Sequence, residues 1–192
     1  MKKPFIMLMM SSCLLSTPSI AQVVVNDPVA TSQAVITCGN ARFTVLTPEM
    51  IRVEYSEQAK FEDRATFTIV NRKLDAPQFT KSEDDTYLYI TTSNLKLKYR
   101  KGTDPRTLPA SPSNLTITIS GNGVSSVWYP GKPDPLNLKG TSRTLDGLMG
   151  ESKRAEMENG LVSRSGWAVI DDSWASPRSD GGRSYALSPN SD

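Results

Sequence analysis

Hydrophobic and polar residues alternate along much of the middle of this chain. Phe43 and Val45 fall on one face of residues 42–46, and residues 51–55 repeat the same two-residue period. The tripeptide Thr-Pro-Glu at 47–49 separates the two segments and is typical of a turn. A two-residue period predicts a strand with one buried face, so these segments predict a hairpin.

Further strand-like segments follow at short intervals, each bounded by turn-forming residues. We expect a third strand to begin at residues 67–69 and a second hairpin around Ser93-Asn94. A third hairpin is expected at Gly121-Asn122-Gly123. The segments that flank these two turns are residues 87–92, 95–99, 115–119 and 127–128.

The spacing of the strands predicts the fold class. Many short strands about 8–12 residues apart favour an antiparallel β-sandwich, because each strand needs a second sheet to cover its apolar face. Residues 101–113 carry three prolines and are expected to form a loop. Residues 151–158 have helical composition but no apolar stripe, so a loop or a single turn is the better interpretation. We therefore predict an all-β protein.

The first 21 residues are typical of a secretory signal peptide. Two lysines precede an apolar run over residues 5–15, and Ser19-Ile20-Ala21 forms a small-x-small cleavage site. This predicts a secreted or periplasmic protein without a transmembrane segment. An alternative is a lipoprotein anchored through Cys13, which follows a loose lipoprotein-box sequence. We expect a lead-in segment at 22–34, a sandwich domain at 35–178 and a disordered tail at 179–192.

Composition narrows the chemistry that the chain can perform. The 192 residues hold 22 Lys+Arg, 20 Asp+Glu and no histidine. The small charge excess argues against nucleic acid as a partner. The lack of histidine excludes His-based zinc sites and histidine general bases, which leaves carboxylates as the main chemical groups. Loss of residues 1–21 would leave Cys38 as the lone cysteine, so we expect no internal disulfide.

Two sequence blocks in the last third resemble a known family. Residues 138–146 read L-K-G-T-S-R-T-L-D, and residues 160–173 read G-L-V-S-R-S-G-W-A-V-I-D-D-S. Both blocks, with their spacing, resemble the signature of the N-terminal domain of glycoside hydrolase family 31, the α-glucosidase and α-xylosidase family. Residues 41–55 resemble the opening strands of that domain. The resemblance covers roughly residues 35 to 178 and implies a galactose-mutarotase-like sandwich.

The family's chemistry follows from the resemblance. It implies a parent reaction of retaining hydrolysis of terminal α-glycosidic bonds through a covalent glycosyl-aspartate, without metal or cofactor. The partner implied is an α-linked oligosaccharide or glycoside. In the family, a loop of this domain reaches over the catalytic barrel and helps to shape the leaving-group side of the pocket.

The second block holds the residues most suited to sugar contact. The indole face of Trp167 can stack on a sugar ring, and the carboxylates of Asp171 and Asp172 can accept hydrogen bonds from hydroxyls. Alternatively, Trp167 fills the core and the two aspartates cap a turn. Residues 169–170 are expected to be an apolar strand pair, which would point Asp171 and Asp172 to opposite faces. They would then not form an acid/base pair.

The first block adds two further candidates, Arg143 and Asp146. They are expected either to contact substrate or to pair with each other and brace the loop. Trp128 and Trp174 are expected to be packing or rim residues, and Cys38 is expected to be a small buried hydrophobe.

The family's catalytic segment is missing from these residues. Family members carry the nucleophile in a W-x-D-M-x-E-like segment of a (β/α)₈ barrel, and no such segment occurs here. We therefore expect a domain truncated before its catalytic barrel, and the barrel is its missing partner. Such a domain should hold no catalytic residue and should not hydrolyse aryl α-glucosides. The alternatives are a stand-alone carbohydrate-binding or surface adhesion sandwich and a gene fragment without function.

Overall fold

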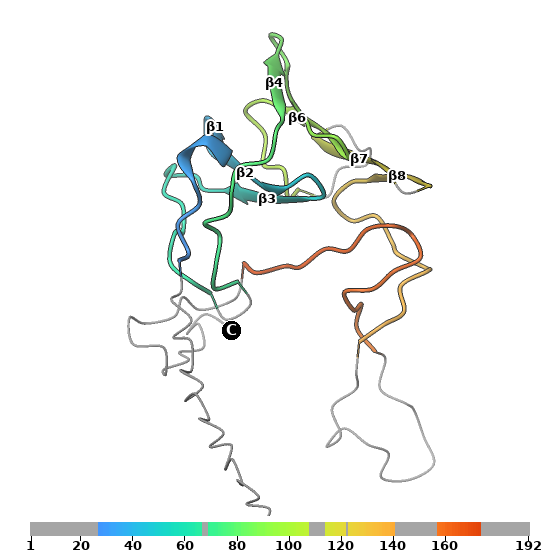
Figure 1. Ribbon diagram of the computed structural model, residues 1–192. Helices are drawn as coiled ribbons and strands as arrows, with labels where there is room; N and C mark the ends of the chain where they lie inside the picture. Colours follow the sequence, from blue (N-terminus) through green and yellow to red (C-terminus); the bar gives the residue numbers. More distant parts are fainter. Residues whose placement is uncertain (1–26, 67–68, 108–113, 122, 141–156, 174–192) are drawn as a thin grey trace, which may run out of the picture.

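The structure is a computed structural model of the chain, and it describes residues 27–66, 69–107, 114–121, 123–140 and 157–173. Within these ranges, eight strands form two antiparallel sheets (Figure 1). The one helical element in the described ranges is a short 3-10 turn, η1 (Ser32–Ala34). The predicted all-β fold is thus confirmed.

The smaller sheet has the strand order β1-β2-β3. Its second hairpin is the one that the alternation around Phe43 predicts, with Phe43 opposite Val53 and Val45 opposite Ile51. The turn of this hairpin lies at residues 48–49, within the predicted turn at 47–49. The strands are β1 (Val35–Cys38), β2 (Ala41–Thr47) and β3 (Met50–Tyr55).

The larger sheet has the order β4-β5-β6-β7-β8 and contains both other predicted hairpins. The edge strand β4 was not expected, because its sequence Thr-Lys-Ser-Glu is polar and exposed throughout. The strands are β4 (Thr80–Glu83), β5 (Tyr87–Thr91), β6 (Leu95–Arg100), β7 (Leu115–Gly121) and β8 (Val124–Trp128).

One hydrophobic core joins the inner faces of the two sheets. In β6 every second residue is buried, as a strand with one inner face requires. Phe43 from β2 meets Tyr99 from β6 with ring centroids 5.0 Å apart. Leu88, Ile90 and Leu97 add aliphatic side chains to the same cluster. Trp128 and Cys38 pack against its margin, and Cys38 is half-buried, whereas the sequence suggested a buried side chain.

The outer face of the smaller sheet is also covered. The first six residues of β2 are all buried, so Arg42 and Thr44 are hidden on the face opposite the core. The guanidinium of Arg42 lies over the ring of Phe61, at 4.7 Å from its centroid. The loop that contains Phe61 therefore covers this face. The lead-in segment is tied to the same loop, because the carbonyl of Asp27 accepts the amide of Arg72 (2.8 Å).

The expected strand at residues 67–69 needs correction. Residues 67 and 68 lie outside the described residues, and Ile69 belongs to no strand. Its amide donates to Thr66 Oγ1 (3.0 Å) and its carbonyl accepts the amide of Thr66 (3.0 Å). A side chain and a backbone group of Thr66 thus replace the hydrogen bonds that a neighbouring strand would supply.

The remaining loop predictions are tested in part. Residues 101–107, the described part of the expected proline-rich loop, contain no strand. Of the segment 151–158, Met157 and Glu158 are described and neither is helical. The signal segment and the tail at 179–192 lie outside the described residues. Within the described ranges, no helix is long and apolar enough to cross a membrane.

Candidate functional site

The second motif block is described in full, whereas the first is described only up to Gly140. Trp167, Asp171 and Asp172 can therefore be placed in the structure. Arg143 and Asp146 fall in residues 141–156, outside the described residues, and their roles stay predictions.

Residues 134–140 and 158–165, which we call the paired loops, run side by side. They share a bridge between Asn137 and Ser163, and the amide of Leu138 donates to the carbonyl of Val162 (2.9 Å). The amide of Arg164 donates to the carbonyl of Leu136 (3.1 Å). The beginning of the first motif block, at Leu138, thus lies beside the second block.

Asp134 holds the paired loops together from inside. Its Oδ1 accepts the hydroxyls of Ser163 (2.8 Å) and Ser165 (2.6 Å), and its Oδ2 accepts a hydrogen bond from the side-chain Nδ2 of Asn137 (3.0 Å). Burial of this side chain opposes ionisation, but the hydrogen bonds from Ser165, Asn137 and Ser163 lower the pKa of Asp134. The sequence analysis missed this residue. The available signal was an aspartate between two prolines, which is common in turns.

Residues 167–173, which we call the strap, leave the paired loops at Gly166 and run back toward the loop that holds Thr66 (Figure 1). Gly166 has φ of 79°, a value that favours glycine. Trp167 is half-buried, and its indole N–H is buried without a hydrogen-bond partner among the described residues. That edge of the ring is therefore packed against the protein.

The expected strand pair at residues 169–170 is wrong. Val169 and Ile170 belong to no strand, and their exposed fractions are 53% and 46%. No strand in the described ranges pairs with the strap, and its apolar residues belong to no sheet there.

Asp171 is exposed and forms a turn with Ser173. Its Oδ1 accepts both the amide (3.0 Å) and the hydroxyl (2.5 Å) of Ser173. These two hydrogen bonds, with a smaller contribution from the charge of Arg106, lower the pKa of Asp171. The sequence left open whether the two aspartates cap a turn, and the structure has such a turn at Asp171. The other oxygen, Oδ2, has no hydrogen bond to a described residue, so it can accept one from a ligand.

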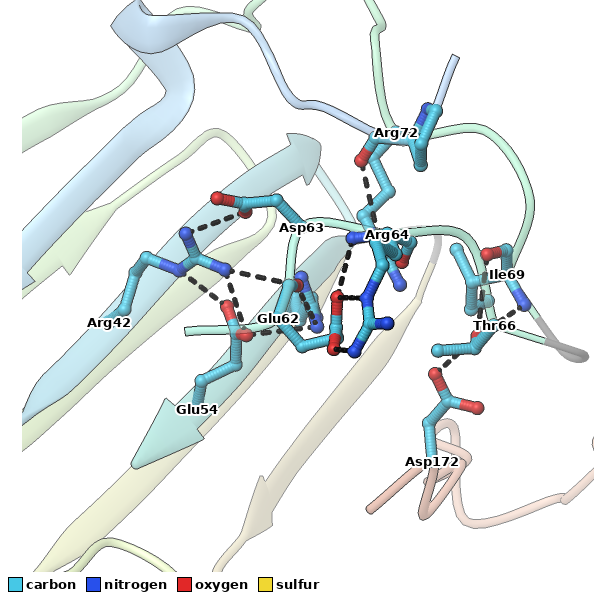
Figure 2. Close-up of polar contacts among 11 residues, drawn as sticks. Arg42, Glu54, Glu62, Asp63, Arg64, Thr66, Ile69, Arg72 and Asp172 are labelled. Carbon is cyan, nitrogen blue, oxygen red and sulfur yellow. Dashed lines mark hydrogen bonds and ion pairs between the residues drawn. The ribbon is translucent and has the colours of Figure 1, made fainter. Parts of the chain in front are cut away.

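Asp172 is half-buried and points the other way, toward the sandwich. The hydroxyl of Thr66 donates to its Oδ2 (2.6 Å), across 106 residues of sequence (Figure 2). Its Oδ1 is buried without a hydrogen-bond partner among the described residues. The two adjacent aspartates thus have different surroundings, one in solvent and one against the protein.

A group of charged side chains lies next to this contact, on the outer face of the smaller sheet (Figure 2). Glu54 binds Arg42 through two hydrogen bonds (2.7 and 2.9 Å) and also pairs with Arg52 (2.9 Å). Asp63 pairs with Arg42 (2.7 Å). Burial by itself would lower the pKa of Arg42, but the hydrogen bonds and charges of Glu54 and Asp63 raise it.

Arg72 is the most buried member of this group, with an exposed fraction of 1%. Its Nη1 donates to the carbonyls of Arg64 (2.9 Å) and Pro28 (3.3 Å). Burial lowers the pKa of Arg72, and the nearby carboxylates of Glu54, Asp172 and Asp63 act in the opposite direction. Sequence reasoning missed Arg72 and Thr66, since neither lies in a motif block and no local pattern marks them.

The described residues do not place the two aspartates of the strap as a catalytic pair. Asp171 and Asp172 differ in partner and exposure and do not face a common space, which a pair of glycosidase carboxylates must do. No group of three or more His, Cys, Asp or Glu among the described residues could hold a metal ion. What the strap offers is an exposed carboxylate, Asp171, four residues after a half-buried tryptophan.

No protein-family model matches this chain, and a search of the curated proteins finds no match for it.

Proposed function

We propose that this chain is the carbohydrate-contacting, galactose-mutarotase-like N-terminal domain of a secreted protein similar to glycoside hydrolase family 31. In this proposal it binds an α-linked oligosaccharide through Trp167 and Asp171. The parent reaction is retaining hydrolysis of a terminal α-glycosidic bond, carried out on a barrel that is not part of these 192 residues. The domain supplies binding contacts and no catalytic residue.

The observation that carries this proposal is how the motif block is held. Hydrogen bonds to Asp134 hold Ser163 and Ser165, and the hydrogen bond from Thr66 holds Asp172 at the other end. Between these anchors, the carboxylate of Asp171 stays in solvent with an unused acceptor oxygen. A loop held at both ends loses less conformational entropy on binding than a free one, which suits it to ligand contact.

The contacts follow from the chemistry of a sugar. A hydroxyl of the ring donates to the carboxylate of Asp171, whose pKa the hydrogen bonds from Ser173 lower further below neutral pH. The indole of Trp167 covers a C–H face of the same or the next ring. Each such contact contributes about 1–3 kcal/mol, so two of them support weak binding with a dissociation constant in the millimolar range.

The proposal is tested by titrating the 192-residue protein with maltotriose and isomaltotriose, with the β-linked cellotriose as a comparison. Backbone and indole NMR signals report binding. We expect saturable shifts at Trp167 and Asp171 with at least one α-linked sugar. Trp167→Ala and Asp171→Asn should weaken binding roughly 5- to 150-fold, the equivalent of 1–3 kcal/mol.

The matched control is Asp85→Asn, which removes an exposed aspartate from the turn between β4 and β5. It should leave binding unchanged. A lower melting temperature with unaltered binding in the Trp167 and Asp171 variants would remove both from the site. No saturable shift with any α-linked sugar would overturn the proposed function.

A further inference from the structure

The outer face of the larger sheet carries cations along one of its strands. In β6, Lys96, Lys98 and Arg100 are exposed and alternate with buried core residues. Every second residue of a strand points to the same face, and such residues lie about 7 Å apart. The three positive charges therefore form a line on the surface, which we call the cationic row.

No acidic side chain lies beside the cationic row. Residues that pair across an antiparallel sheet share a face, and the partners of the row carry hydroxyl groups without negative charge. These partners are Thr91, Thr118, Tyr89, Thr116 and Tyr87. Among the described residues, no ion pair joins a member of the row to a carboxylate. This face therefore concentrates positive charge, although the chain holds 22 Lys+Arg and 20 Asp+Glu.

Two carboxylates near the β4–β5 turn have other contacts. Asp84 accepts two backbone amides through Oδ1 (2.8 and 2.7 Å) and the hydroxyl of Tyr89 through Oδ2 (3.0 Å). Glu83 pairs in register with buried Leu88, so it belongs to the other face of the sheet. Neither carboxylate forms an ion pair with the cationic row.

The needs of the sheet do not account for the cationic row. Lysines on an edge strand prevent unwanted pairing with other chains, but β6 lies in the middle, between β5 and β7 (Figure 1). Stability alone favours opposite charges across neighbouring strands, and like charges on one face repel each other. A row of uncompensated cations on a central strand is what a binding face for a polyanion presents.

The groups around the row suit a sugar chain better than a nucleic acid base. Nζ of Lys98 lies 4.0 Å from the centroid of the Tyr87 ring, so a cation already occupies that face of the ring. Single strands of nucleic acid are bound by aromatic rings on which their bases stack. Lys96 instead lies between two hydroxyl groups, those of Thr91 and Thr118. Such hydroxyls can exchange hydrogen bonds with the hydroxyls of a sugar.

We propose that the cationic row binds an acidic polysaccharide with one carboxylate per sugar, a polyuronate, along β6. The carboxylates pair with Lys96, Lys98 and Arg100, and the planar guanidinium of Arg100 donates two parallel hydrogen bonds to one of them. Cations about 7 Å apart match this sparse charge better than that of DNA, which carries one charge about every 1.7 Å. This surface uses none of the residues of the proposed function and stands independently of it.

The experiment titrates the 192-residue protein with β-linked polymannuronate at low salt and follows the backbone NMR signals. We expect saturable shifts at residues 96, 98 and 100. Binding should weaken as salt is added, because salt screens contacts between exposed charges. The β linkage separates this ligand from the α-linked sugars of the proposed function, so each proposal can fail without the other.

Variants separate the row from the charge of the whole chain. Lys96→Gln combined with Arg100→Gln should weaken binding at least tenfold and make it less dependent on salt. Lys98→Arg keeps the charge and should retain binding. The matched control is Lys60→Gln, which removes an exposed lysine from the loop after β3 and should leave binding unchanged. These side chains are exposed, and circular dichroism should show the same fold in every variant.

The proposal is overturned if polymannuronate causes no saturable shift at residues 96–100, or if the double variant binds it as tightly as the unaltered protein. Equal binding of neutral β-linked mannohexaose at the same residues would also overturn it, because the carboxylates would then play no part. Tighter binding of single-stranded oligothymidylate to the row would identify a nucleic acid as its ligand and overturn the assignment to a polysaccharide.

Discussion

Tyr99 shows how a single side chain is changed by its position in the core. It is 1% exposed, packs against Phe43, and donates its hydroxyl to the carbonyl of Thr103 (2.5 Å). Burial, with a smaller effect from Cys38, raises the pKa of Tyr99 to about 12. The neutral phenol is thus favoured in the folded state, where an ionised oxygen would be desolvated.

This shift makes stability depend on alkaline pH. A pKa raised on folding contributes stability that is complete below the unfolded value of about 10 and is lost as pH rises through about 12. We expect Tyr99→Phe to cost roughly 1 kcal/mol at pH 8, through the lost hydrogen bond, and to flatten the fall in stability above pH 10. Urea unfolding from pH 8 to pH 12 measures both effects.

The control for this prediction is Tyr129→Phe, at a half-buried position after β8. It should keep the alkaline fall seen in the unaltered protein. An equally steep fall in Tyr99→Phe would contradict the assigned role of the Tyr99 phenol.

At the scale of elements, the paired loops depend on close backbone contact. A Cβ at Gly160 would lie 2.5 Å from the carbonyl oxygen of Lys139, a distance that backbone atoms cannot accommodate without moving. The amide of Gly160 also donates to Asn137 Oδ1 (2.8 Å), which in turn accepts the amide of Lys139 (2.8 Å). The close approach of the Lys139 carbonyl therefore leaves room only for glycine at position 160.

We expect Gly160→Ala to separate the paired loops without unfolding the sandwich. Amide exchange at Leu138 and Arg164, which bond across the loops, should rise at least tenfold, while exchange in β2 should not change. Gly140→Ala is the control, because its Cβ would meet the carbonyl of Glu158 at an ordinary 3.6 Å. Equal exchange in both variants would contradict the steric argument.

At the scale of the whole molecule, one hydrophobic core is shared by two sheets whose strands do not pair with one another. Phe43 and Val45 come from the smaller sheet, and Leu88 and Leu97 come from the larger one. Neither sheet can bury its inner face without the other, so the two should unfold together.

Phe43→Ala tests this cooperation. Deleting a fully buried phenyl ring should lower the free energy of unfolding by about 3–5 kcal/mol, a large part of the total for a domain of this size. Amide exchange at Thr44 in β2 and at Lys98 in β6 should rise by the same factor. A rise confined to the smaller sheet would indicate two independent units.

The control for this substitution is Tyr87→Ala on β5. Tyr87 is half-buried on the outer face, where Lys98 Nζ lies 4.0 Å from its ring centroid. Loss of this exposed contact should cost only about 1 kcal/mol, because water can replace most of it.

The alternation of side chains by itself determined the fold class and most strands. The β2–β3 and β5–β6 hairpins could be predicted because each needs only neighbouring residues: an apolar face of period two and a turn between the strands. The strand β4 escaped prediction because its polar residues carry no such pattern. It forms by pairing with the exposed edge of β5, which is a property of the sheet.

The candidate residues of the strap could be proposed from their types, but their surroundings could not. Sequence marks Trp167, Asp171 and Asp172 as suited to sugar contact, and it leaves open which of them face solvent. The contact of Asp172 with Thr66 joins residues 106 positions apart. Periodicity records only which side of a local segment is buried. Which distant charges must compensate each other is decided when the chain folds, because only then are they removed from water.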